Sequence, residues 1–178
     1  VNYLSGQKGR AIRYNKKFNS DQDYLGIRPL LREGNIVSTE YAYERVPHEL
    51  DPFDDETYKN SPAKFYAVVT DIETGEGQYI HVKSVFDQMD VLRASGSMPL
   101  VSRPVEIDGH KYLDGAIADS IPYEWMMNQG VDKTIVILAR DASYRKKPMN
   151  RLMTNLYKKE YPLFAEGMAN RHNLYNQH

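Results

Sequence analysis

The chain contains no cysteine among its 178 residues. This absence excludes disulfide bonds, thiolate metal sites and a cysteine nucleophile, and it is compatible with a reducing compartment. No apolar run approaches the ~20 residues that a membrane-spanning helix needs. The formal net charge is −1, which argues against a general binder of nucleic acid or other polyanions. We therefore expect a cytoplasmic protein that binds no nucleic acid.

Several motifs with well-defined chemistry are absent as well. The chain has no Gly-x-Gly-x-x-Gly and no phosphate-binding P-loop, which disfavours nucleotide binding. None of its serines has glycine both two residues before and two residues after it, so the nucleophile motif Gly-x-Ser-x-Gly does not occur. The five histidines lack the spacing of metal ligands. We expect neither a metal nor a cofactor.

The composition is that of a folded globular protein, with 41% hydrophobic and 26% charged residues. A chain of this length can bury a sizeable core, and we treat residues 1–178 as one domain. The fourteen tyrosines predict amphipathic packing at surfaces or interfaces.

Two continuous apolar runs, Phe65–Ile72 and Thr134–Leu138, are rich in β-branched residues and predict strands buried on both faces. Between them we expect a helix over 84–95, whose apolar residues recur at helical spacing, and a second helix over 120–129 that Ser120 caps and Gly130 ends. A strand, a helix and a parallel strand with short connections form a right-handed crossover. The pattern predicts an α/β fold with a layered sheet and flanking helices, from which the first strands are missing.

The ends of the chain read as helical or irregular. Residues 1–18 predict a helix with four basic residues toward solvent and Ile12 packed inward; the basic residues are Arg10, Arg13, Lys16 and Lys17. Residues 19–60 read as turn-rich, with short helices near 24–31 and 54–59. Residues 143–178 read as helical.

The strongest candidate for a functional motif is a pair of Asp-Gly dipeptides, Asp108-Gly109 and Asp114-Gly115. The first lies between strand-like pieces at 105–107 and 110–113, which indicates a type I′ hairpin turn with positive φ at both positions. The second falls where the returning strand ends, beside a residue without a side chain. Asp114 is therefore the best candidate for chemistry, although Asp-Gly is also common in ordinary turns.

Several motifs in order resemble the C-terminal half of a patatin-like phospholipase domain, most clearly over about residues 60–140. They are the hairpin 65–81, Val91-Leu-Arg-Ala-Ser-Gly-Ser-Met-Pro99, Pro104-Val-Glu-Ile-Asp-Gly109, Tyr112-Leu-Asp-Gly-Ala116 and Ile121-Pro122. The resemblance implies that Asp114 is half of a Ser-Asp catalytic dyad and that Gly115 and Ala116 form its supporting loop. Ala116 stands where that family often has a second glycine.

The resemblance also implies a part that this sequence does not contain. The family's nucleophile and glycine-rich oxyanion loop precede the matched region, and Val1-Asn-Tyr-Leu-Ser-Gly6 resembles the end of the helix after the nucleophile. We hypothesise that the chain is a fragment of a serine acyl hydrolase acting on phospholipid or another acyl ester, inactive alone, with its serine a few residues before Val1. The alternative is a non-catalytic α/β binding or scaffold domain.

The remaining candidates are weaker. Ser95 and Ser97 lack a nucleophile elbow and suit a helix end packed beside the Asp114 loop. His110 lies four residues before Asp114 and could suggest a catalytic triad, but a polar residue after the hairpin turn is expected to be exposed. The acidic run 51–56 lacks the spacing of a calcium loop and reads as a solvated helix start.

Residues 145–159 combine basic side chains with apolar ones at helical spacing. Such a segment suits the surface of an anionic membrane, which would make this a peripheral membrane protein. It suits equally a surface helix docked on the sheet. The sequence leaves both readings open, and it leaves the oligomeric state undetermined.

Overall fold

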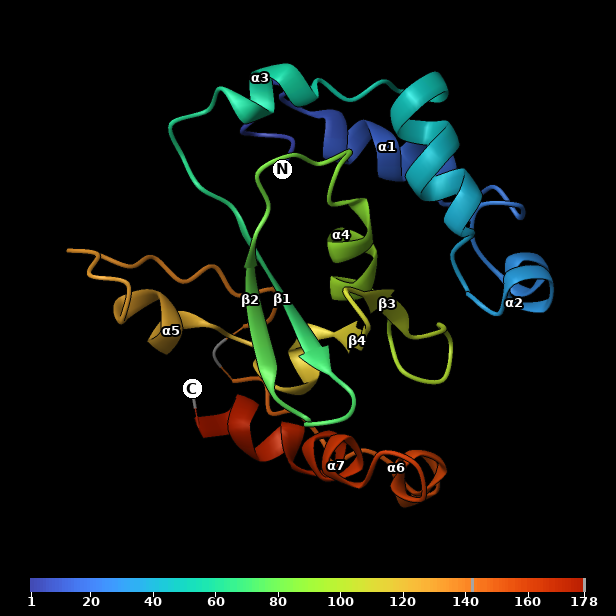
Figure 1. The fold of residues 1–178 in the computed structure, drawn as a ribbon, viewed down its shortest axis with the longest axis vertical. Helices are drawn as coiled ribbons and strands as arrows, with labels where there is room; N and C mark the ends of the chain where they lie inside the picture. Colours follow the sequence, from blue (N-terminus) through green and yellow to red (C-terminus); the bar gives the residue numbers. More distant parts are fainter. Residues whose placement is uncertain (142, 178) are drawn as a thin grey trace.

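The structure, a computed structural model, describes residues 1–141 and 143–177 (Figure 1). Helices surround a four-stranded sheet, which confirms an α/β fold with flanking helices. All strand pairs in this sheet are antiparallel and the strand order is β2-β1-β4-β3, so β1 and β4 are central. The strands are β1 (Tyr66–Asp71), β2 (Gly77–His81), β3 (Val105–Ile107) and β4 (His110–Asp114).

The second hairpin turns as the sequence predicts, and a carboxylate organises the turn of the first. Between β3 and β4, Asp108 has φ 52° and Gly109 has φ 81°, so both central residues are left-handed, as a type I′ turn requires. Between β1 and β2, the Asp71 carboxylate accepts the backbone N–H groups of Glu73 at 2.8 Å and Thr74 at 3.1 Å. Asp71 therefore shapes its turn rather than serving a separate site.

The helix α4 (Met89–Ser95) covers one face of the sheet, where Ala94 packs with Val69 and Val105. It begins later than the predicted start at Ser84. The reason is Asp55, whose carboxylate accepts the Ser84 hydroxyl at 2.8 Å and the Val85 backbone N–H at 2.6 Å. These bonds hold 84–88 in a turn. Asp55 is consequently buried, so the expectation of a fully solvated acidic run was wrong at this residue.

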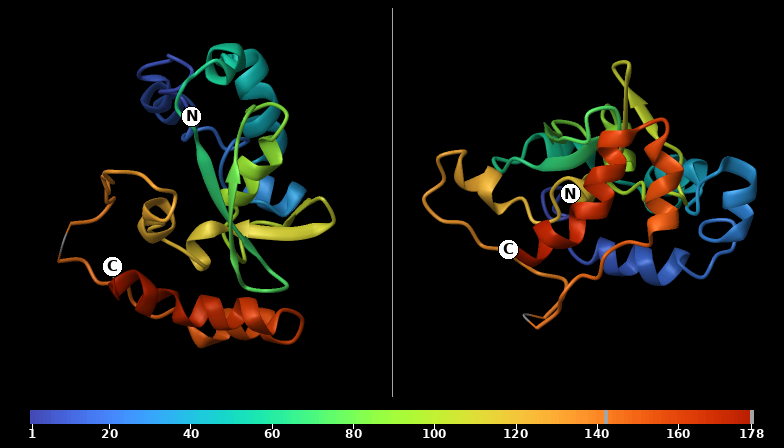
Figure 2. Two further views of the ribbon diagram at one scale, coloured as in Figure 1. Left: turned by 60° about the vertical axis from the view of Figure 1, so that its left-hand side comes forward. Right: turned by 90° about the horizontal axis from the view of Figure 1, so that it is seen from below.

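A second core joins the sheet to the C-terminal helices. The 3-10 turn η2 (Gly115–Ile117) and the helix α7 (Pro162–Gln177) enclose five buried side chains, which are Ile72, Leu113, Ile117, Phe164 and Met168. The helix α6 (Arg151–Lys158) lies beside α7, as the view from below shows (Figure 2). In the described part of the chain, no helix has both the length and the apolar character that crossing a membrane requires.

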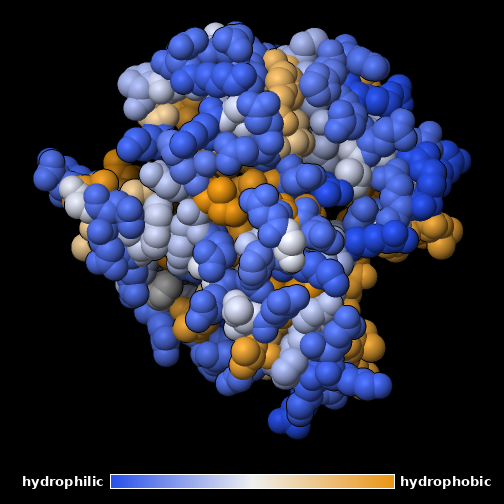
Figure 3. Space-filling view, viewed as in Figure 1, coloured by the Kyte–Doolittle hydropathy of each residue, from blue (hydrophilic) through white to orange (hydrophobic). Residues whose placement is uncertain are grey.

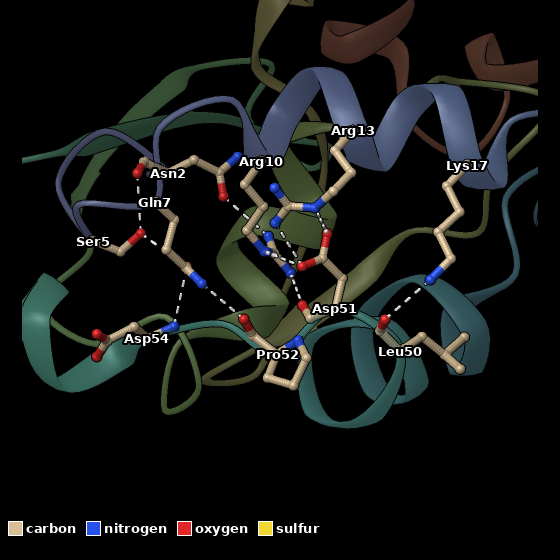
Figure 4. Close-up of polar contacts among 10 residues, drawn as sticks. All are labelled: Asn2, Ser5, Gln7, Arg10, Arg13, Lys17, Leu50, Asp51, Pro52 and Asp54. Atoms are coloured by element: carbon tan, nitrogen blue, oxygen red, sulfur yellow. Dashed lines mark hydrogen bonds and ion pairs between the residues drawn. The ribbon is translucent and has the colours of Figure 1, made fainter.

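The N-terminal helix is shorter than predicted and is rotated about its axis. The helix α1 (Arg10–Phe18) buries Arg10, which was expected at the surface, and exposes Ile12, which was expected inside. Asp51 explains the rotation, because Arg13 pairs with its carboxylate at 2.9 Å while Arg10 donates to its backbone oxygen (Figure 4). Arg10 also donates to Asn2 Oδ1 at 3.0 Å, so the buried guanidinium has partners.

The turn-rich region contains more helix than predicted. The helices α2 (Ile27–Glu33) and α3 (Asp55–Lys59) lie close to the expected ones, but η1 (Glu40–Leu50) is a π-helix in a stretch that reads as irregular. Proline in a helix interior normally breaks the helix, so Pro47 made a helix unexpected from the sequence at this position. Rings of Tyr14, Phe18, Tyr24 and Tyr41 pack against one another where η1 meets α1, which accounts for part of the tyrosine content.

The predicted strand Thr134–Leu138 is not a strand in this structure, and the predicted parallel crossover is therefore also wrong here. Ile135 is 87% exposed and Ile137 is 91% exposed. The four strands pair with one another, and the segment pairs with none of the described strands. Instead it follows α5 (Tyr123–Met127) and lines a cavity of about 390 Å³ together with Ile121 and Met126.

Candidate functional site

Asp114 occupies a rigid position at the centre of the sheet. It is the last residue of β4 and lies opposite Val69 of β1. Its backbone N–H donates to the carbonyl oxygen of Ser97 at 2.9 Å, and its own carbonyl oxygen accepts the Thr70 hydroxyl at 2.9 Å. The backbone of this residue is thus fixed from both neighbouring elements, so its side chain leaves the strand in a defined direction.

Gly115 is required because the chain passes very close to β1. A Cβ atom at this position would lie 2.1 Å from the carbonyl oxygen of Val68, a distance that no side chain tolerates. The two Asp-Gly dipeptides therefore need glycine for different reasons. Gly109 supplies a left-handed backbone in open space, whereas Gly115 permits a close approach.

Ala116 orients the carboxylate of Asp114. Its backbone N–H donates to Asp114 Oδ1 at 2.8 Å, so Asp114 caps η2. The Ala116 carbonyl oxygen accepts Ser120 Oγ at 2.7 Å and Arg171 Nε at 2.7 Å, which anchors the loop to α7. Ser120 was expected to cap α5 and instead makes this bond. Among the described residues, hydrogen bonds to the carboxylate reach Oδ1 alone, which leaves Oδ2 for another donor.

Asp114 belongs to a partly buried stretch of chain, and two cationic side chains approach this stretch. Leu113 and Ile117 on either side are fully buried, and Asp114 itself is half-buried. Burial and the charge of Arg171 hold the pKa of Lys146 below its usual value, while the Asp114 carboxylate acts in the opposite direction. Lys146 thus lies within electrostatic reach of Asp114, and Arg171 binds the carbonyl oxygen of Ala116 two residues further along the chain. No motif marks either residue in the sequence, and only the docking of the C-terminal segment reveals them.

The weaker candidates lie elsewhere or are already engaged. Ser97 is buried and its hydroxyl donates to the Arg93 carbonyl oxygen at 2.8 Å, so the end of α4 packs beside the Asp114 loop as expected. His110 is exposed, and its Nδ1 lies 3.3 Å from Asp71 Oδ2 on the hairpin. Within the described residues, no three His, Asp or Glu side chains gather in a way that would hold a metal ion.

Comparison with known proteins identifies the family to which the chain belongs. A family model described as patatin-like phospholipase matches residues 5–126, which is more than half of the chain. The chain belongs to the patatin-like phospholipase family. The match contains the end of α4, both strands of the second hairpin and the loop 114–116.

The patatin-like region extends further toward the N-terminus than the motifs alone indicate. The motifs are clear over about 60–140, whereas the family match starts at residue 5 and includes α1, α2, η1 and α3. It ends at residue 126, before the exposed run 134–138 and before α6 and α7. The residues that bring cations to Asp114 therefore lie outside the matched region.

One relative is similar over much of this chain. It is the uncharacterised protein YjjU of Escherichia coli (strain K12), which is 25% identical over 140 residues. The alignment covers 76% of this chain and 38% of the relative. The chain thus spans well under half the length of that protein.

Proposed function

We propose that this chain supplies the catalytic base of a serine acyl hydrolase and that the base is Asp114. Family membership supports a lipid acyl hydrolase kind of function. The single observation that carries the proposal is the position of Asp114, which is fixed by β1, β4 and α4 and keeps Oδ2 without a hydrogen bond among the described residues. The substrate class is a phospholipid or another acyl ester.

The proposed chemistry needs a carboxylate at a defined place. A serine hydroxyl must lose its proton as it attacks an ester carbonyl carbon, and in a dyad the carboxylate accepts that proton directly. Asp114 Oδ2 would have to lie about 2.6–3.2 Å from the hydroxyl oxygen. The bond from Ala116 to Oδ1 keeps the carboxylate from turning away, which supports Oδ2 as the proton acceptor.

The serine itself would come from a segment outside this sequence. Val1 lines the same pocket as Val85 and Met89 near the N-terminal end of α4, whereas the Asp114 N–H donates to the Ser97 carbonyl oxygen just beyond the opposite end. The seven residues of α4 span about 10 Å, a distance that about three extended residues or about seven helical residues cover. This geometry is compatible with a nucleophile a few residues before Val1. The 178-residue chain alone should then hydrolyse no ester.

The test uses the longer protein that contains this chain. Asp114→Asn keeps an oxygen for the Ala116 N–H and should therefore fold normally, but it removes the base. We expect turnover of a p-nitrophenyl ester to fall by ~100-fold or more. Labelling by a fluorophosphonate, followed by mapping of the modified residue, identifies the nucleophile and should slow in the same variant.

Asp108→Asn is the matched control, because it changes the other Asp-Gly dipeptide at a left-handed position that Asn also accepts. It should leave turnover unchanged. Full activity in Asp114→Asn would overturn the dyad. A longer protein that neither hydrolyses esters nor reacts with a fluorophosphonate would instead favour a binding or scaffold domain.

A further inference from the structure

The helix α6 leaves both of its leucines exposed to solvent, whereas its buried residue is a threonine. Thr154 is buried against α7, while Leu152 is 74% exposed and Leu156 is 72% exposed. These leucines are four residues apart and therefore form one ridge on the outer face. A helix that only needed to dock on the sheet would place its leucines inward.

The inner face of α6 is already satisfied without those leucines. The ring of Tyr157 packs edge-on against Phe164 of α7 at 5.2 Å between ring centres. The Tyr157 hydroxyl accepts the Leu100 backbone N–H at 3.1 Å, and the Thr154 hydroxyl donates to the Arg151 carbonyl oxygen at 3.0 Å. The attachment of α6 to the molecule therefore leaves the leucine ridge without a role in the fold.

The segment around the ridge is strongly basic. Residues 145–159 contain six Lys or Arg and no Asp or Glu, although the chain as a whole has a net charge of −1. Lys147, Arg151, Lys158 and Lys159 in this segment are all exposed. In Figure 3 the lower part of the molecule, where α6 and α7 lie, shows hydrophobic residues directly beside hydrophilic ones.

We propose that this face of α6 docks on an anionic lipid bilayer. The leucines would enter the boundary between headgroups and acyl chains, and the cations would pair with lipid phosphates. An exposed pair of leucines in a segment with six cationic and no anionic side chains suits the surface of an anionic membrane by charge complementarity. The inference rests on α6 alone and does not depend on the acyl hydrolase proposal.

The experiment is flotation of the purified protein with vesicles of phosphatidylcholine alone or with 30% phosphatidylglycerol. We expect binding to the anionic vesicles to be at least tenfold tighter and to weaken as salt is raised. The double variant Leu152→Ser/Leu156→Ser should lose at least tenfold in binding. Lys158→Gln/Lys159→Gln should weaken binding and flatten its salt dependence.

Ile135→Ser/Ile137→Ser is the matched control, because it removes two apolar side chains elsewhere on the surface that are even more exposed than the leucines. It should bind vesicles as the unchanged protein does. Turnover of a soluble ester by the longer protein should be the same with and without the leucine substitutions, so failure here is separate from failure of the dyad.

Two results would overturn the proposal. One is absence of binding to anionic vesicles, or binding that survives the leucine substitutions. The other is loss of vesicle binding that is equal in the isoleucine control. Binding to polyglutamate but not to vesicles would assign the face to an acidic protein instead.

Discussion

Two apolar runs that both predict a buried strand differ in the structure, because one is a buried strand and the other is exposed and forms no strand. Phe65–Ile72 contains β1 and ends in Ile72, which is 0% exposed. Thr134–Leu138 forms no strand and contains Ile137, which is 91% exposed. Both runs have the continuous β-branched pattern of a strand buried on two faces.

The difference shows that a continuous apolar sequence pattern indicates which residues need to be buried, but not which neighbouring strands and helices will bury them. The β1 run has β2 and β4 on its two edges, α4 on one face, and η2 with α7 at its end. The 134–138 run lines one side of a cavity whose other residues include Ile121, Met126 and Tyr175, and it pairs with none of the described strands. Hydrogen-bonding neighbours on both edges, rather than hydrophobicity, separate the two.

The largest expected effect comes from one substitution made in both runs. Ile72→Ala should lower the free energy of unfolding of this chain by about 2–5 kcal/mol, because it opens a cavity beside Leu113 and Phe164. Ile137→Ala should change it by less than ~0.5 kcal/mol. Urea unfolding followed by circular dichroism measures both.

Equal costs for the two isoleucine variants would break the comparison. A large cost for Ile137→Ala in the longer protein, with a small one in this chain, would sharpen it instead. That outcome would mean that the run is buried against residues outside this sequence, as the strand pattern predicts.

Two glycines test whether the backbone is tightly packed beside β1 and loosely packed before the 134–138 run. Gly115→Ala should cost about 3 kcal/mol or more, since the new Cβ meets the Val68 carbonyl oxygen of β1 and backbone must move. Gly130→Ala, just before the exposed run, meets nothing within 4 Å and should cost only the ~1–2 kcal/mol of its left-handed φ of 75°. Thermal unfolding of both variants gives the difference. A Gly115→Ala variant as stable as Gly130→Ala would show that the loop is not tight.

The sequence predicts what depends on neighbouring residues and fails where distant ones decide. The turn at Asp108-Gly109 follows from local φ requirements, and the position of Asp114 at the end of a short strand follows from the hairpin. The inward rotation of Arg10 depends on Asp51, and the late start of α4 depends on Asp55. Neither of these long-range contacts produces a periodic pattern of apolar residues in the sequence.

Some residues of the candidate site were predictable from the sequence, and others were not. The motifs mark Asp114, Gly115 and Ala116, and the structure gives each a physical reason through a cap, a close approach and an anchor. Lys146 and Arg171 come from segments more than 30 residues away in sequence and carry no motif. Their proximity to Asp114 could only be found once α7 was seen packed on η2.

The smallest expected effect should differ in sign between the two runs. Thr70→Val in β1 removes the hydroxyl that donates to the Asp114 carbonyl oxygen at 2.9 Å and accepts the Ala118 N–H at 3.2 Å. It should cost about 1–3 kcal/mol, because both backbone groups lose their partner in a partly buried place. Thr134→Val removes a buried hydroxyl that has no hydrogen-bond partner among the described residues, so stability should stay equal or rise by up to ~1 kcal/mol. Parallel urea titrations of the two variants compare them directly. A destabilising Thr134→Val would mean that this hydroxyl is hydrogen-bonded in solution, and the 134–138 run would then resemble β1 more closely than its exposure indicates.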